Sequence, residues 1–154
     1  MLQTASGELK FLYPEYFHMM SIEEIDRYFC DHTNRIGIRS NERHVIVSVS
    51  YTKPKIVNYL TDAKSVLSSA ERNMKRNLKN YRCIEKRQFD VASKKAYSVR
   101  FEYTATDSPV EQCGELIVFR VNQKFYSIYY VSLKSLDQEN HRDFQAILNS
   151  MKLA

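Results

Sequence analysis

Short hydrophobic blocks separated by turn residues dominate the second half of the chain. The two clearest blocks are residues 115–121 and 124–131, which predict paired strands. Asn122 and Gln123 separate them, and Asn tolerates the positive φ that a tight two-residue hairpin turn requires. The pattern therefore predicts a β-hairpin near the C-terminal end of a sheet-rich region.

The same kind of pattern predicts five further strands, over residues 9–13, 35–39, 43–52, 81–89 and 96–104. Pro14 and Pro54 end two of them, because Pro has no amide hydrogen to donate to a strand ladder. In the strand over 43–52 the valines share one side, whereas Ile46 lies on the other side with Ser48 and Ser50.

Three segments repeat hydrophobic residues every three or four positions, which predicts helices. The first runs over residues 21–31 and begins with a capping box. In such a box the Ser21 hydroxyl accepts from the amide of Glu24, and the Glu24 carboxylate accepts from that of Ser21. The last covers about residues 140–150, and its hydrophobic stripe is Phe144, Ile147, Leu148 and Met151.

The longest predicted helix covers residues 62–79 and is capped by Thr61 or Asp62. One hydrophobic stripe follows it, made of Ala63, Val66, Leu67, Ala70, Met74 and Leu78. Such a stripe indicates a helix that packs one side against the sheet.

The order of elements is strand, helix, two strands, long helix, four strands and helix. Runs of adjacent strands favour an antiparallel sheet that helices cover on both faces. We therefore predict an α+β fold, an α/β/α sandwich with a central antiparallel sheet. The length of 154 residues and a hydrophobic fraction of 44% fit a single domain over residues 1–154.

Several segments, taken in order, resemble the PsbP-like superfamily. They are Phe11-Leu-Tyr-Pro-Glu-Tyr16, the helix Asp62 to Leu78, Ala96-Tyr-Ser-Val-Arg-Phe-Glu-Tyr103, and Phe125-Tyr-Ser-Ile-Tyr129 followed by Phe144-Gln-Ala-Ile-Leu-Asn-Ser150. This superfamily includes the photosystem subunit PsbP, a Ran-binding nuclear import factor, and bacterial lipoproteins and adaptors. The resemblance implies the same sandwich and non-enzymatic work in binding and assembly. Residues for manganese or calcium handling, or for an acidic Ran-binding patch, are not matched.

The net charge of +5 is concentrated in one basic segment, residues 72–87. Its cations are Arg72, Lys75, Arg76, Lys79, Arg82, Lys86 and Arg87. On a helix the first four would share one face, which would attract a phosphate backbone or an anionic lipid surface. The alternative is an ordinary solvated outer face opposite the hydrophobic stripe.

The aromatic residues of the last predicted strand form a second candidate site. Alternation places Tyr126 and Tyr130 on one face of the sheet, and Phe125 and Tyr129 on the other. These rings either belong to the core or line a groove between sheet and helix, suited to an amphipathic peptide or a small apolar ligand.

No residue pattern indicates a catalytic, metal or cofactor site. The four His do not stand at ligand spacing, and the three Cys, at positions 30, 83 and 113, form no Cys-x-x-Cys pair. We interpret the cysteines as small buried hydrophobic residues, and one disulfide with one spare thiol stays open. The three Gly are isolated, which excludes a Gly-rich phosphate loop. We therefore expect no catalytic residues, no cofactor and no enzyme activity.

The sequence thus predicts a binding or adaptor domain whose partner is a protein or peptide. The alternative is a basic-surface module that contacts nucleic acid or an anionic membrane through residues 72–87, and a homodimer stays open as well. No signal peptide or transmembrane segment is visible, so we expect a cytoplasmic protein. An extracytoplasmic or membrane-anchored protein is the alternative, if a signal preceded Leu2.

Overall fold

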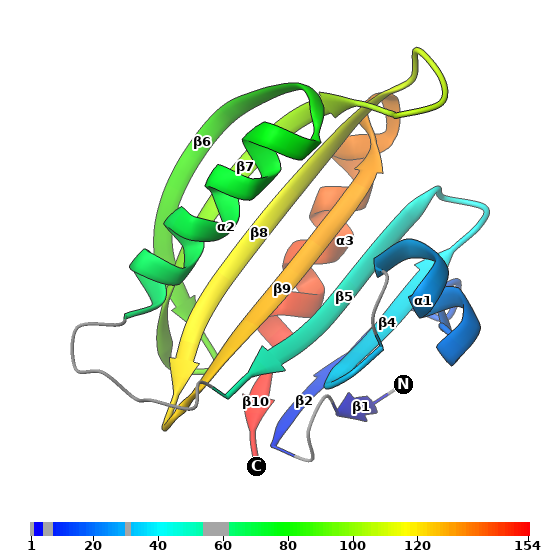
Figure 1. Ribbon diagram of the computed structural model, residues 1–154. Coiled ribbons are helices and arrows are strands. Elements are labelled where there is room, and N and C mark those ends of the chain that lie inside the picture. Colours follow the sequence, from blue (N-terminus) through cyan, green and yellow to red (C-terminus); the bar gives the residue numbers. More distant parts are fainter. Residues whose placement is uncertain (1, 5–7, 30–31, 54–61) are drawn as a thin grey trace.

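The fold is built on a seven-stranded antiparallel sheet, shown in Figure 1. A computed structural model describes residues 2–4, 8–29, 32–53 and 62–154. The elements along the chain are β1 (Leu2–Thr4), β2 (Leu9–Leu12), β3 (His18–Met19), α1 (Ile22–Phe29), β4 (Arg35–Ser40), β5 (Val45–Thr52), α2 (Ala63–Asn77), β6 (Lys79–Val91), β7 (Lys94–Thr104), β8 (Glu111–Val121), β9 (Lys124–Leu133), the 3-10 helix η1 (Lys134–Leu136), α3 (Asp137–Ser150) and β10 (Lys152–Leu153).

The strand order in the large sheet is β3-β4-β5-β9-β8-β7-β6, and every neighbouring pair is antiparallel. Helices α1 and α2 lie on the front face in Figure 1, and α3 lies on the back. A small sheet, β1-β2-β10, adjoins α3 on that same side. The predicted α+β sandwich with a central antiparallel sheet is confirmed.

Each face of the sheet has its own hydrophobic core. On the α3 side, Tyr126, Ile128 and Tyr130 pack with Phe144 and Ile147. On the α2 side, the stripe of the long helix packs with alternate residues of β7, β8 and β9; this core contains Ala63, Leu67, Val99, Phe101, Leu116, Val118 and Phe125. The alternation predicted for the last strand is confirmed, because its odd-numbered and even-numbered residues enter different cores.

The long helix is shorter at its C-terminal end than predicted. It ends at Asn77, and Lys79 is the first residue of β6 instead of the last residue of the helix. The reason is tertiary: Lys79 pairs with Thr104 of β7, and Leu78 already has an extended backbone. At the other end, Asp62 is the cap, since its Oδ1 accepts from the Ser65 amide at 2.8 Å. The predictions that involve Cys30, Asp31, Pro54 and Thr61 lie outside the described residues.

The capping box predicted for the first helix is present in α1. The Glu24 amide donates to Ser21 Oγ at 3.2 Å, and the Ser21 amide donates to Glu24 Oε1 at the same distance. Ser21→Ala leaves the Glu24 amide without its acceptor, so we expect a loss of about 1 kcal/mol in the free energy of unfolding. Urea denaturation would measure it. Ser21→Asp, which restores an acceptor, should behave like the original protein, and equal losses in both variants would contradict the capping role.

Candidate functional site

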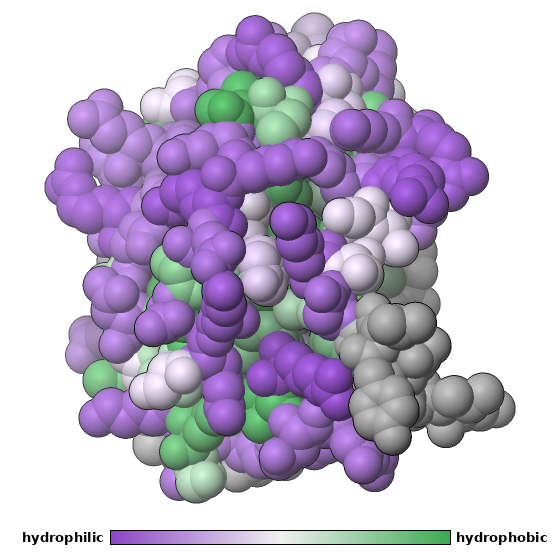
Figure 2. All heavy atoms as spheres, turned by 90° about the vertical axis from the view of Figure 1, so that its left-hand side faces the viewer, coloured by the Kyte–Doolittle hydropathy of each residue, from purple (hydrophilic) through white to green (hydrophobic). Residues whose placement is uncertain are grey.

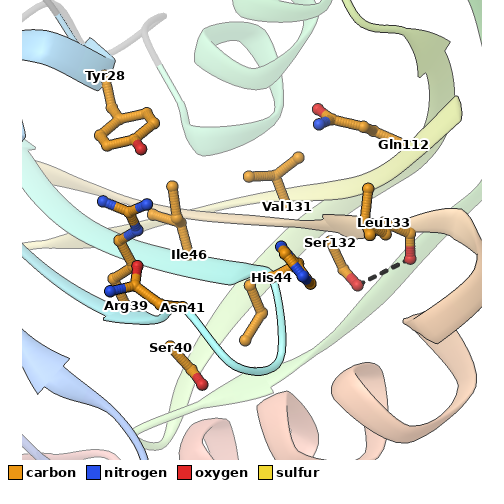
Figure 3. Close-up of a pocket in the computed structure, with 11 residues that line it drawn as sticks. Tyr28, Arg39, Ser40, Asn41, His44, Ile46, Gln112, Val131, Ser132 and Leu133 are labelled. Carbon is orange, nitrogen blue, oxygen red and sulfur yellow. Dashed lines mark hydrogen bonds between the residues drawn. The ribbon is translucent and has the colours of Figure 1, made fainter. Parts of the chain in front are cut away.

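A groove on the front face of the sheet is the candidate binding site (Figure 3). It encloses about 180 Å³ and opens to solvent between α1, the β4–β5 turn and the last residues of β9. The lining residues are Tyr28, Arg39, Ser40, Asn41, His44, Val45, Ile46, Gln112, Val131, Ser132 and Leu133. They come from six different elements or turns, so the groove exists only in the folded protein.

The floor of the groove is aliphatic. Ile46 of β5 and Val131 of β9 are directly paired across the sheet and are both partly exposed. Figure 3 shows Tyr28 and Gln112 on either side of these two residues. The Tyr28 ring, on the last turn of α1, is 42% exposed. A hydrophobic floor between an aromatic and an amide side chain is suited to one aliphatic side chain of a ligand.

Helix α1 is held against the sheet by buried and aromatic contacts. Its Ile25 is buried, and the Phe29 ring meets the Tyr129 ring edge-on at 6.1 Å between centroids. The Arg35 guanidinium lies 4.6 Å from the centre of the Phe29 ring. These contacts fix the position of Tyr28, one residue before Phe29, and so fix one wall of the groove.

The polar groups around the groove are one cation, Arg39, and neutral groups that can donate hydrogen bonds. The Arg39 guanidinium lies over the Tyr28 ring at 4.9 Å and is 3.5 Å from a Glu24 oxygen outside the groove. Asn41, His44 and Gln112 add further polar side chains, and no Asp or Glu is among the lining residues. The groove therefore favours a ligand that combines an aliphatic group with a carboxylate.

The structure divides the predicted basic segment into two groups. Arg72, Lys75, Arg76 and Lys79 are exposed on the last turns of α2 and the start of β6, and we call these four residues the cationic patch. The other three cations are engaged in ion pairs: Arg82 with Glu102, Lys86 with Glu71 at 3.2 Å, and Arg87 with Glu115 at 3.0 Å. Figure 2 shows this side of the molecule, where hydrophilic side chains predominate and hydrophobic areas are small and interrupted.

Lys79 and Arg82 also border two adjoining hollows at the C-terminal end of α2. The larger, of about 880 Å³, is an open depression between Lys79, Val110 and Lys134. Two of its charged groups are partnered with each other, since Lys134 Nζ is 3.4 Å from Glu111, and this lysine is also 3.5 Å from Glu102. Leu133 borders both this hollow and the groove.

Tyr126 and Tyr130 lie in the core, the alternative that the sequence left open, and not on a binding surface. Both are 0% exposed. Tyr126 stacks on Phe119 with centroids 5.4 Å apart, and Tyr130 stacks on Phe144 at 4.7 Å. The Tyr130 hydroxyl donates to Asp137 at 2.6 Å. Alternation alone could not show that both rings are buried. It assigns each residue to one face of the strand, but it does not say how completely a helix covers that face.

A buried ionic network on the α3 side was not predicted. Glu115 is 0% exposed and accepts from Ser98 Oγ and from Arg87 at 3.0 Å, while His141 Nε2 lies 2.6 Å from its other oxygen. Burial raises the pKa of Glu115, but the hydrogen bonds from His141 and Ser98 and the nearby charges outweigh it, so the pKa is lowered overall. The carboxylate is therefore held ionised inside the protein.

The thiols and the possible metal ligands of the described residues bear on the expectation that the chain has no catalytic or metal site. Cys83 is exposed and Cys113 is buried, and both are free thiols. Burial raises the pKa of the Cys113 thiol to about 12, which leaves it protonated and unreactive at neutral pH. Within the described ranges no three His, Cys, Asp or Glu side chains gather as metal ligands, and no helix there is long and apolar enough to span a bilayer.

Comparison with known proteins identifies the fold. No protein-family model matches the chain, and no curated protein matches its sequence. Solved structures do match: the solution structure of cyanobacterial PsbP (CyanoP) from Synechocystis sp. PCC 6803 has a TM-score of 0.65 and 12% identity, over 99% of this chain and 92% of that one. The chain has the PsbP-like fold.

Two further proteins share this PsbP-like fold. LpqN of Mycobacterium tuberculosis, described as involved in cell envelope biogenesis, matches with a TM-score of 0.67 and 10% identity, over 95% of this chain and 83% of that one. The Saccharomyces cerevisiae Ran-binding protein Mog1p matches with a TM-score of 0.60 and 7% identity, over 96% of this chain and 90% of that one. At these identities the likeness concerns the fold, and the resemblance noted in the sequence is confirmed at that level.

Proposed function

We propose that this chain is a non-enzymatic binding domain that takes a short segment of a protein partner into the groove. An aliphatic side chain of the partner lies on Ile46 and Val131, and a neighbouring carboxylate of the partner lies beside Arg39. One observation carries the proposal: the groove combines an aliphatic floor with cationic and neutral polar walls and has no carboxylate in its lining.

The size of the groove favours a peptide segment over a small molecule. Its volume of about 180 Å³ is below the range of roughly 300–1,000 Å³ that is typical of small-molecule sites. One or two side chains of a partner fill such a space, and the rest of the contact is then made by the rim. That Mog1p, which has the same fold, is a Ran-binding protein is consistent with a protein partner.

Selection from a random peptide library tests the proposal. We expect the enriched peptides to pair an aliphatic with an acidic residue, and to bind Val131→Arg and Tyr28→Ala at least about tenfold more weakly than the original protein. Val131→Arg fills the groove with a second cation, and Tyr28→Ala removes one wall. Isothermal titration calorimetry would measure each affinity, and thermal melting would show that both variants are folded.

Ile84→Arg is the matched control for Val131→Arg. Ile84 is 49% exposed on β6, at the opposite end of the sheet from β4 and α1. The control should bind the peptides as the original protein does. Peptides that bind Val131→Arg and Tyr28→Ala with unchanged affinity would overturn the proposal, as would a library that yields no peptide of this kind.

A further inference from the structure

The cationic patch differs from the other basic residues of its segment because its cations have no ion-pair partner in the part of the chain that the structure describes. Arg72, Lys75, Arg76 and Lys79 form no ion pair with any other residue that the structure describes. Arg76 makes one hydrogen bond, to the side-chain oxygen of Asn73 at 2.5 Å. Four like charges are thus gathered within eight residues of the chain and are exposed to solvent.

The one carboxylate of α2, Glu71, has its hydrogen bond and its ion pair outside this patch, and the charge of Lys75 is near enough to help lower its pKa. Glu71 is buried, accepts from the Tyr81 hydroxyl at 2.9 Å and pairs with Lys86 of β6. Arg72 and Arg76 are four residues apart on the helix, where like charges repel. The negative end of the helix dipole offsets part of this repulsion, and an external anion would offset the rest.

We infer that the cationic patch is a second docking surface, which binds a segment rich in Asp and Glu of a protein partner. Charge complementarity is the first argument, because four unpaired cations fit a run of carboxylates. Proximity is the second: Lys79 borders a hollow that shares the lining residue Leu133 with the groove. A surface of this kind is distinct from the groove, where the aliphatic floor makes much of the contact.

Two other anionic partners fit the patch less well. A peripheral membrane helix inserts hydrophobic side chains, but Met74 and Leu78 pack into the α2-side core, and Asn73, Asn77 and Asn80 are polar. A single nucleic-acid strand is held by stacking on aromatic side chains, and residues 72–80 contain none. Four cations are also fewer than the roughly 6–10 phosphate contacts of a salt-sensitive duplex-binding protein.

Fluorescence anisotropy with a labelled polyglutamate peptide tests the inference. Arg72→Glu/Arg76→Glu should weaken binding by at least about tenfold, because it replaces attraction by repulsion. Arg72→Gln/Arg76→Gln should weaken it less. Lys94→Glu/Lys95→Glu is the matched control, since it makes the same change in net charge at exposed positions at the start of β7, next to the end of β6 that lies far from residues 72–77 of α2. The control should retain most of the affinity.

Equal weakening by Arg72→Glu/Arg76→Glu and by the control would mean that only net charge matters, and it would overturn the inference. Tighter binding of a DNA duplex, or of phosphatidylserine vesicles, through the same two arginines would overturn it in favour of those partners. Val131→Arg separates the two surfaces: polyglutamate should still bind this groove variant, and its loss there would show that the patch is not an independent site.

Discussion

Replacing Glu115 by alanine is expected to lower the free energy of unfolding by about 3 kcal/mol, because it leaves the groups around a buried charge without their partner. Glu115 neutralises Arg87, accepts from Ser98 and contacts His141, so it joins β6, β7, β8 and α3. The loss should be at the lower end of the range for broken buried pairs, since Arg87 is partly exposed and water can solvate it. Urea denaturation would measure this loss, provided that the dependence of the free energy of unfolding on urea concentration is the same for both proteins.

Glu85→Ala is the control for this loss. Glu85 also lies near Arg87, at 3.9 Å from its Nε, but its side chain is half exposed. Exposed ion pairs contribute little, so we expect a change within about 0.5 kcal/mol. A Glu115→Ala variant that is as stable as Glu85→Ala would show that the buried network does not stabilise the fold.

The pH dependence of the Glu115 contribution has a definite sign. The pKa of Glu115 is lower in the folded protein than the unfolded value of about 4.3. The ionised carboxylate therefore adds stability above about pH 4.3, and this stability is lost as the pH falls through the folded-state pKa. The difference in stability between the original protein and Glu115→Gln should shrink below about pH 4. A difference that stays constant in acid would contradict a role for the charge.

The fold follows from the sequence largely because its signals are local. Each of the three helices repeats hydrophobic residues every three or four positions, and the capping box at Ser21 lies within four residues. The boundary between α2 and β6 was not predictable in the same way. It is set by the pairing of Lys79 with Thr104, which are far apart in the chain, and a helical or an extended state suits Lys79 equally well on local grounds.

The groove was not predictable because its parts are assembled from distant segments. Ile46 could be seen as a hydrophobic residue among serines on one side of β5, which was the one available signal. The sequence predicted that its partner Val131 lies on a sheet face that helices cover completely. The structure shows instead that α1 and α2 leave Ile46 and Val131 partly exposed. The division of the basic segment is a similar case, because Glu71 of α2, Glu102 of β7 and Glu115 of β8 pair with its cations on β6.

Replacing Gly114 by alanine is expected to lower the free energy of unfolding by about 2–3 kcal/mol through overpacking. A Cβ at this position would lie 2.5 Å from Cζ of Phe101, its cross-strand neighbour on β7. The Phe101 ring has no free space to enter. It is 1% exposed, stacks on Tyr81 at 5.4 Å and packs against Tyr103 and Tyr129 at 5.9 and 6.2 Å. Thermal or urea denaturation would measure the loss.

Gly37→Ala is the matched control for Gly114→Ala. A Cβ on Gly37 would meet Met20 Sδ at 2.7 Å, a clash of similar depth. Because Met is flexible and can take another rotamer, we expect a smaller loss there, of about 1 kcal/mol. Combining Gly114→Ala with Phe101→Leu should recover part of the loss relative to the sum of the two single changes, since the smaller side chain yields space. Strict additivity would show that the cost of Gly114→Ala does not come from this ring.

Gly114 also connects the α2-side core to the groove. It pairs with Phe101 on one side and with Val131 on the other, and Val131 pairs in turn with Ile46. These four cross-strand neighbours therefore form a row across the sheet, from the tightly packed aromatic cluster around Phe101 to the floor of the groove. A side chain at position 114 that pushes β7 and β8 apart should also disturb the floor, so peptide binding by Gly114→Ala should weaken more than by Gly37→Ala. Equal binding by the two variants would show that the core strain stops at β8.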